Sequence, residues 1–458
     1  MKSEFEELLG IAPIDRLKEI IRGVYGIDSA VDSCIESQLL RENPVALAKQ
    51  LKKRIQSLKR GSRFISYGES FDFSKSLNAL VRDIELLLSS SPQLAFVAAD
   101  DFMATHQKVF ERVDDSGGAV GDSYRQGLHL WLQAASRWRE QQADNARTEW
   151  PTELYTRHLN NPYGMWDTLI QQSTSLLSEE ELRQLAWRFE GESRRALKDD
   201  LEEPYNRKLM TASLGMAAVA QALKDVELYE RSYLLRSPQP NELQKQSIIE
   251  FCLAVGDGEA ALRWLDGEWH SRFEADRLRL LDATLAMLGR HDELIDLRRA
   301  VYDVTPGFEN LQALLQVLPE QEKAQVQHAA VSRALQTSDL EISIATLIAL
   351  GASDQAAQEV LDHADKLTKV FYGTLSQWAS SFANSEHYLA AVICYRVLLE
   401  DILNAGRSTA YGHAVRYYKR LAELGTKIPN YHALMNGDDY VSELRRVHGR
   451  KASFWREI

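Results

Sequence analysis

The sequence concentrates basic side chains in two segments that could bind anions. Residues 41–63 carry eight Lys or Arg against one Glu, a local charge of +7, and residues 405–458 carry ten against five, a local charge of +5. Ammonium and guanidinium groups at this density can contact phosphates or an acidic partner. The side chains that would contact phosphates are Lys49, Lys52, Lys53 and Arg60 in the first segment, and Arg445, Arg446, Arg450 and Lys451 within 445–456.

The first basic segment also has a plainer interpretation. It predicts an amphipathic helix from about Val45 to Lys59, with Leu47, Leu51, Ile55 and Leu58 on its apolar face. Charged residues on the opposite face of such a helix commonly meet only solvent. The connector that follows, residues 61–73, holds four aromatic residues. These rings could stack nucleobases, although rings in a connector more often pack onto the helices that it joins.

Catalytic and metal-binding motifs are missing from the sequence. It contains no phosphate-binding glycine loop, dinucleotide fingerprint, zinc-protease helix or nucleophile elbow. Its three cysteines are far apart in the chain, which indicates a reducing compartment and neither a disulfide framework nor a zinc site. We therefore expect no enzymatic activity, no cofactor and no bound metal.

The Gly- and Asp-rich segment 114–122 has the composition of a calcium loop or an anion-binding loop. An EF-hand needs a Glu at its twelfth position, where this chain has Arg125. The segment instead predicts a capped turn between two helices, with Asp122 near the N-terminus of the second helix.

Composition places the chain among mainly α-helical globular proteins. Of its 458 residues 45% are hydrophobic and 26% are charged, and the net charge is -12. A negative net charge argues against a protein that coats nucleic acid with its whole surface. The sequence has no run of about 18 apolar residues and no N-terminal signal core. These observations predict a cytoplasmic protein that makes no membrane contact.

Turn-like clusters recur at a nearly fixed interval in the second half of the chain. They begin at Gly256, Gly289, Pro319, Gly351 and Asn384, in steps of 33, 30, 32 and 33 residues. Each cluster lies between two apolar runs with helical spacing. A helix-turn-helix unit repeated at this period is the signature of stacked hairpins. We predict an all-α fold of stacked helical hairpins, a TPR-like α-solenoid.

The sequence predicts four regions. They are N-terminal helices with a basic helix (1–60), a helical domain (61–236), the TPR-like repeats (237–404) and a capping hairpin with a basic aromatic tail (405–458). Two prolines in residues 237–240 mark the second boundary. Long helices are expected at 123–142, 178–198 and 204–234. Phe454 and Trp455 are expected to dock onto the preceding hairpin, because a free tail would hardly keep two exposed rings.

Four short patterns resemble an uncharacterised bacterial helical family. They are the loop 114–122 followed by Leu128-His129-Leu130, Asn161-Pro162-Tyr163-Gly164, Arg407-Ser408 with Tyr411 and Ala414, and the terminal Tyr440, Leu444, His448-Gly449-Arg450-Lys451 and Phe454-Trp455. The resemblance spans from about residue 60 to the end. It implies relatives that occur alone or downstream of SWIM-type zinc fingers, and it implies no activity. This chain lacks the cysteines and histidine of that finger, so neither zinc nor a zinc-borne DNA contact is carried over.

Stacked hairpins expose a concave groove, and this predicts a binding function. We expect a non-enzymatic scaffold that mediates protein–protein interaction in a bacterial cytoplasmic complex and holds a partner or peptide in that groove. Tyr and Arg are enriched at interface hot spots. The expected binding face is therefore Tyr395, Arg396, Tyr411, Arg416, Tyr417 and Lys419, unless the tyrosines pack between hairpins. The alternative is a nucleic-acid-binding subunit of a DNA-acting bacterial system, while the oligomeric state does not follow from the sequence.

Overall fold

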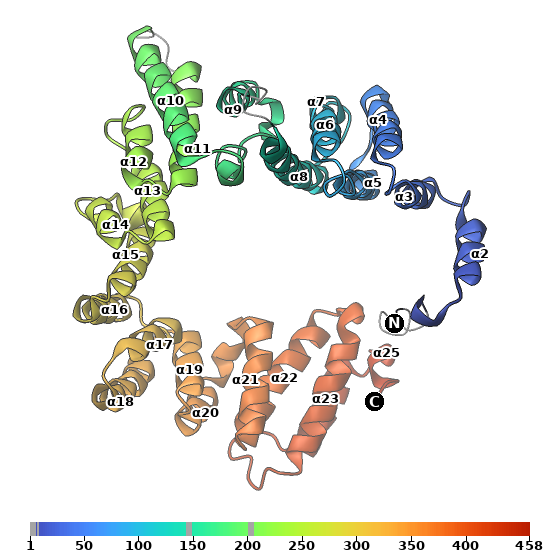
Figure 1. Ribbon diagram of the computed structural model, residues 1–458. Helices are drawn as coiled ribbons and strands as arrows, with labels where there is room; N and C mark the ends of the chain where they lie inside the picture. The colour runs from blue at the N-terminus through green and yellow to red at the C-terminus, as the bar shows by residue number, and fades with distance from the viewer. Residues whose placement is uncertain (1–5, 7–8, 143–148, 200–205) are drawn as a thin grey trace. The chain divides into compact units, whose positions relative to one another are not determined.

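The computed structural model describes residues 6, 9–142, 149–199 and 206–458, and these residues form an all-α structure (Figure 1). Within them, β pairing is limited to one isolated bridge between Ile65 and Val113. Contacts divide the chain into two units, Met1–Leu280 and Leu281–Ile458. The predicted all-α class is confirmed. The four predicted regions stay a prediction, and the first of them begins in residues 1–5 and 7–8, which lie outside the described residues.

The first unit is a succession of helices. Their bounds are α2 Ile14–Val24, α3 Ser29–Leu39, α4 Pro44–Arg60, α5 Tyr67–Glu85, α6 Pro92–Met103, α7 His106–Phe110, α8 Ala119–Gln141, α9 Trp150–Leu159, α10 Glu179–Asp199, α11 Arg207–Leu223, α12 Val226–Leu234, α13 Glu242–Val255, α14 Gly258–Leu265 and α15 Glu274–Leu288. Helix α15 crosses the boundary between the units. None of the helices in the described part of the chain is long and apolar enough to cross a bilayer.

Helix α4 forms where the sequence predicts it. Asn43 caps it by accepting a hydrogen bond from the Ala46 amide at 3.2 Å, and Pro44 occupies the first turn. Its buried residues are Leu47, Leu51 and Ile55, and the helix packs mainly on α6 and also touches α5. Burial of these aliphatic side chains holds α4 in place and turns its opposite face outward.

The loop before α8 is a capping device, as predicted, but the capping residue differs from expectation. The two carboxylate oxygens of Asp115 accept hydrogen bonds from the Val120 amide at 2.9 Å and the Gly121 amide at 2.8 Å. Asp122 lies in the first turn of the helix and pairs with Arg125. The helix starts at Ala119 rather than Ser123 because Asp115 reaches forward to satisfy its first amides.

The helical segment expected over about 204–234 is divided into two helices, α11 and α12. Lys224 adopts a left-handed conformation with φ of 55° and ends α11, and the Asp225 side chain then caps α12 by accepting from the Leu228 amide at 3.0 Å. The sequence gives only a weak signal for this helix end, because Lys is not a residue that favours positive φ. Residues 204 and 205 lie outside the described residues.

The second unit continues the alternation of helix and turn. Its helices are α16 His291–Val304, α17 Phe308–Val317, α18 Glu320–Gln336, α19 Leu340–Ala349, α20 Ser353–Asp362, α21 Tyr372–Asn384, α22 Tyr388–Asn404, α23 Tyr411–Gly425, α24 Gly437–His448 and α25 Ala452–Trp455. Each of the five predicted turn clusters falls between two helices of the chain. Close packing joins α19 to α20 and α21 to α22, whereas α16 packs on α17 across Pro306-Gly307.

The C-terminal tail docks as predicted. Phe454 is fully buried, and its ring meets the edges of Tyr411 and Tyr418. The Trp455 indole donates a hydrogen bond to the His448 carbonyl at 3.0 Å. Both rings therefore fasten α25 to α23 and α24.

His158 is the histidine through which we expect acid to destabilise the first unit. It is largely enclosed between α9 and α11, where its Nε2 lies 2.9 Å from the Thr211 carbonyl and its ring stands edge-on to Phe189. Burial lowers the pKa of this imidazole, and Asp167 opposes the shift. The neutral ring is thus favoured by folding, so its contribution is complete above about pH 6.5, the pKa of an unfolded histidine, and is lost as pH falls below that value.

We expect the urea concentration at the unfolding midpoint to be lower at pH 5.5 than at pH 7.5. In His158→Gln this difference should be smaller. Glutamine can still donate to the Thr211 carbonyl but carries no titrating group. His129, an exposed residue of α8, serves as the control in His129→Gln. Equal pH dependence in the wild type and both variants would contradict the assignment.

Candidate functional site

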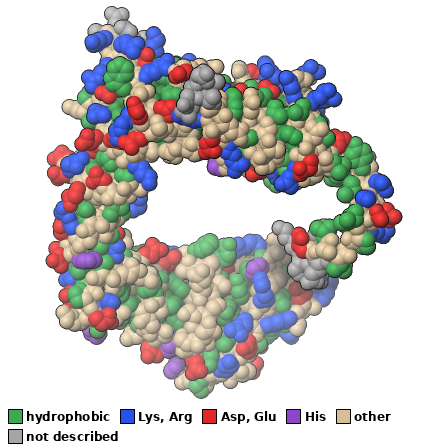
Figure 2. Space-filling view, viewed as in Figure 1, with side chains coloured by type: hydrophobic (Ala, Val, Ile, Leu, Met, Phe, Trp, Pro, Cys, Tyr) green, Lys and Arg blue, Asp and Glu red, His purple; other side chains and the backbone are tan. Residues whose placement is uncertain are grey.

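Helix α4 presents a strip of like charge to solvent. Lys49, Lys52, Lys53, Lys59 and Arg60 are all exposed, and at 100° per residue they fall within one third of the helix circumference, opposite the apolar face. The helix contains no Asp or Glu. Among the described residues no ion pair is recorded for any of these five side chains. Figure 2 shows Lys and Arg side chains gathered over α4 in the upper right of the view. We call these five residues the α4 basic strip.

Arg54 is the basic residue of α4 that does not belong to the strip. It points inward and forms an ion pair with Asp83 of α5, whose side chain is only 7% exposed. Its Nη1 also lies 3.4 Å from the Ser37 hydroxyl of α3. This residue therefore holds α4 against its neighbours, a role that its place in the basic segment does not indicate.

Three exposed aromatic rings follow the basic strip directly. Phe64, Tyr67 and Phe71 are 62%, 61% and 63% exposed. The expectation that rings in this connector pack onto the joined helices holds for none of the three. The ammonium of Lys75 lies 4.5 Å from the centre of the Phe71 ring. We call Phe64, Tyr67 and Phe71 the aromatic triad.

The backbone holds the triad outward at a fixed place. The Ile65 amide donates to the Arg112 carbonyl at 2.8 Å and the Asp114 amide donates to the Ile65 carbonyl at 2.9 Å. These bonds bury the Ile65 side chain, so that the neighbouring Phe64 must face away. At the start of α5, the Ser66 amide and hydroxyl donate to Glu69 at 3.1 and 2.9 Å. These hydrogen bonds hold the pKa of Glu69 below its usual range.

Arg112 links the end of α4 to the triad. Its guanidinium donates to the Leu58 carbonyl at 3.4 Å and to the Arg63 carbonyl at 3.2 Å. It fits beside Gly61, where a Cβ would come within 2.9 Å of Nη2. The Arg112 side chain thus ties the end of α4 to the segment that leads to the triad.

The predicted protein-binding residues divide between core and surface. Tyr395 and Tyr411 are buried, and Tyr395 packs on Tyr417 with ring centres 5.8 Å apart. Arg416 and Lys419 are exposed. The two buried rings join α22 to α23 and do not face solvent.

Arg396 lines a groove of about 680 Å³ in the second unit. Its guanidinium lies 4.1 Å from the centre of the Tyr440 ring and donates to the Met435 carbonyl at 2.8 Å. Its Nε is buried without a hydrogen-bond partner among the described residues, and burial lowers the pKa of this side chain. Asp438 also lines the groove.

The second predicted basic patch is less free than the α4 basic strip. Arg446 donates two hydrogen bonds to Glu443, at 2.7 and 2.5 Å, and Arg445 lies over the Trp455 ring at 5.2 Å. Arg450 is exposed and Lys451 half-buried. Two of its four cations are therefore already engaged by their own unit.

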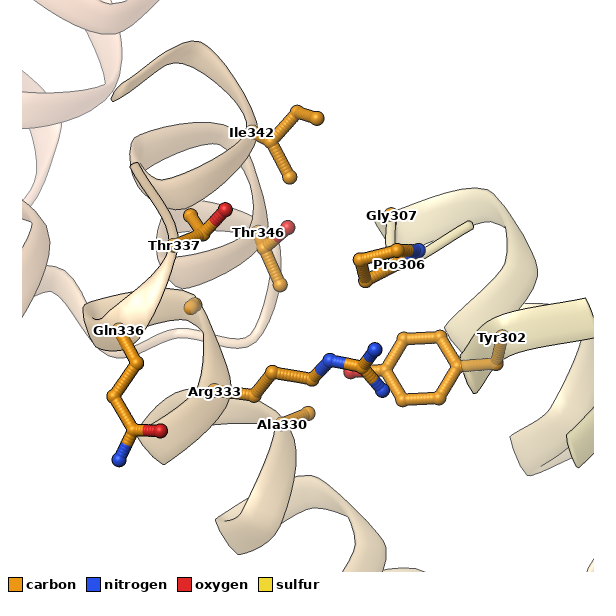
Figure 3. A pocket seen from close by; sticks show the side chains of 10 residues that line it. Tyr302, Pro306, Gly307, Ala330, Arg333, Gln336, Thr337, Ile342 and Thr346 are labelled. Atoms are coloured by element: carbon orange, nitrogen blue, oxygen red, sulfur yellow. The ribbon is translucent and has the colours of Figure 1, made fainter. Parts of the chain in front are cut away.

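A smaller pocket of about 260 Å³ lies between α16 and the helices α18 and α19 (Figure 3). The Arg333 guanidinium lies beside the Tyr302 ring, 5.2 Å from its centre. Arg333 also pairs with Asp303 at 3.0 Å and donates to the Asp303 carbonyl at 2.6 Å. The Arg333 charge is therefore already paired within the fold. This guanidinium is not available to bind an anion in the pocket.

No group of three or more His, Cys, Asp or Glu that could hold a metal ion occurs in the described residues. Cys34 is exposed, while Cys252 and Cys394 are buried. Burial raises the pKa of both buried thiols to about 12, so each stays protonated near neutral pH and is a poor nucleophile. The chemistry available at the α4 basic strip is the binding of anions.

A family model described as a family of unknown function (DUF6880) matches residues 37–457. This match confirms the resemblance to an uncharacterised family. The matched part includes all of α4, the aromatic triad and the second unit, whereas α2 and most of α3 precede it. No curated protein and no solved structure matches the chain.

Proposed function

The chain belongs to the DUF6880 family of unknown function, and because that description names no activity, we propose a function from the surfaces of the molecule. The protein is a non-enzymatic helical-repeat scaffold, with hairpins stacked as a TPR-like α-solenoid, whose α4 basic strip binds the phosphate backbone of nucleic acid. The single observation that carries this proposal is a 17-residue helix with six Lys or Arg and no acidic residue.

Unpaired charge separates α4 from an ordinary solvated helix. On α10 of the same unit, Arg183 pairs with Glu179, Arg194 with Glu190 and Arg195 with Glu192. Such pairs are typical of a face that meets only water. On α4 the like charges repel one another, and the Debye length of about 8 Å at physiological salt is longer than one helical turn. A polyanion would relieve this repulsion.

The dimensions of the strip also suit a phosphate backbone. Lys49 and Arg60 are eleven residues apart, which is about 16 Å along a helix. One strand of a duplex carries a phosphate about every 3.4 Å of its axis. Five cations thus face about five phosphates, and because the whole chain has a net charge of -12, this attraction is local to basic surfaces such as the strip.

We expect the affinity for nucleic acid to depend steeply on salt. Five phosphate contacts predict a slope of log K against log[salt] of about -3.5 for single strands, so affinity falls about a hundredfold between 50 and 200 mM salt. Fluorescence anisotropy of a labelled 20-nucleotide oligonucleotide measures the slope. A slope near zero, or tighter competition by polyglutamate than by unlabelled oligonucleotide, would contradict the proposal and favour an acidic protein partner.

A second candidate function is a protein contact at the groove beside Arg396. The observation that favours it is a groove of about 680 Å³ lined by Arg396, Tyr440 and Arg445, because Tyr and Arg are the residue types most enriched at interface hot spots. Pull-down from native cells with and without nuclease, comparing the wild type with Arg396→Gln, tests this candidate. A protein that is retained after nuclease and lost in the variant would support it.

A further inference from the structure

We propose that the nucleic acid bound by α4 is single-stranded and that its bases stack on the aromatic triad. This inference rests on the proposed phosphate binding, and it adds the class of nucleic acid and the residues that select it.

The triad has the geometry of a stacking platform. Tyr67 and Phe71 are four residues apart on α5, so their rings share one face of the helix. Phe64 precedes them and faces outward because Ile65 is pinned inward. Tyr67 rests beside the glycine loop, where a Cβ on Gly117 would lie 3.4 Å from Cε2 of the ring. One edge of this ring is thereby supported while the ring as a whole stays 61% exposed.

The position of the triad next to the strip connects stacking with phosphate contact. Lys59 and Arg60 end α4, and Gly61-Ser62-Arg63 lead directly to Phe64. Arg112 bonds to backbone carbonyls on both sides of this connection. A strand whose phosphates follow α4 toward its C-terminus therefore arrives with its bases at the triad.

Exposed rings alone would be weak support for a binding site, because single surface aromatics are common. Here three such rings occur within residues 64–71, next to a helix with unpaired cations. Basic grooves with aromatic side chains are the general solution for binding single strands without sequence preference, since every base has a face that can stack. Bases inside a duplex are already stacked on one another and cannot reach the rings, so the triad selects unpaired strands.

The test compares three probes on the full chain at 0.1 M salt. They are a labelled 20-nucleotide oligo-dT, a 20-base-pair duplex, and an abasic 20-mer that has the same phosphates and no bases. We expect oligo-dT to bind about a hundredfold more tightly than the abasic strand, because each of three stacked bases contributes fivefold or more. The duplex should bind more weakly than oligo-dT.

The variant Phe64→Ala/Tyr67→Ala/Phe71→Ala should lose this hundredfold advantage. Its affinity for the abasic strand and its salt slope should stay unchanged, because the basic strip is intact. The matched control changes three aromatics elsewhere that are similarly or more exposed, Trp187→Ala/Phe371→Ala/Tyr372→Ala, and should bind as the wild type does.

Each outcome decides between the two proposals. Equal binding of oligo-dT and the abasic strand by the wild type, together with a steep salt slope, would overturn the stacking inference and leave phosphate binding by α4 in place. Failure to bind any of the three probes would overturn both. The comparison of probes on the wild type needs no variant. It therefore still tests the stacking inference if the triple variant misfolds.

Discussion

Replacing Lys49, Lys52, Lys53, Lys59 and Arg60 together by Gln is expected to abolish binding of a single-stranded oligonucleotide at 0.1 M salt. Losing five phosphate contacts removes a salt slope of about -3.5. Relative to 1 M salt, this slope contributes about three thousandfold to the affinity at 0.1 M salt. The five side chains are exposed and make no recorded ion pair among the described residues. Unfolding midpoints should therefore change little, and anisotropy titration of the labelled strand measures the loss.

A matched control removes the same charge from other helices. Arg183, Arg194, Arg195, Arg263 and Arg279 belong to the same unit, are exposed, and pair with acidic neighbours. Their replacement by Gln should lower affinity far less, since their charges are already compensated. If both quintuple variants lose affinity equally, binding would reflect net charge alone, and the assignment to α4 would be wrong.

Breaking the buried pair between Arg54 and Asp83 is expected to give the largest loss of stability. Asp83→Leu leaves a guanidinium without its carboxylate in a place where Arg54 keeps only 23% of its side chain exposed. Removal of one partner of a buried pair costs about 3–5 kcal/mol of unfolding free energy. The residual exposure of Arg54 places our expectation at the lower end of that range.

The double variant Arg54→Met/Asp83→Leu separates pairing from packing. Apolar residues of similar volume in both places leave no unpaired charge, so we expect the double variant to recover most of the stability that Asp83→Leu loses. Urea unfolding of the wild type, both single variants and the double variant gives the coupling free energy. Additive losses in the four-member cycle would show that the two side chains do not depend on each other.

The sequence predicts α4 nearly to its ends because one segment carries every signal of a helix. Asn43, Pro44 and an apolar residue every third or fourth position agree locally, and no distant contact is needed to read them. Which basic residues of α4 stay free could not be predicted in the same way. Arg54 is engaged by Asp83, 29 residues away, and sequence alone does not show that contact.

The exposure of the triad likewise could not be predicted from the sequence, because it depends on a long-range contact. Ile65 is fixed by Arg112 and Asp114, far along the chain, and this decides the direction of Phe64. For Tyr395 the reverse holds, because α22 is packed by both α21 and α23. A residue type that is favoured at interfaces thereby becomes a core residue, and sequence periodicity cannot separate the two on a helix that is buried on several sides.

The most direct test of the account is to map where a bound strand touches the protein. Ultraviolet cross-linking of an oligo-dT 20-mer to the full chain, followed by mass spectrometry of the peptides, identifies the side chains in contact. We expect adducts on Phe64, Tyr67 or Phe71 that disappear in the quintuple α4 variant. Adducts confined to other segments, such as residues 445–456, would contradict it.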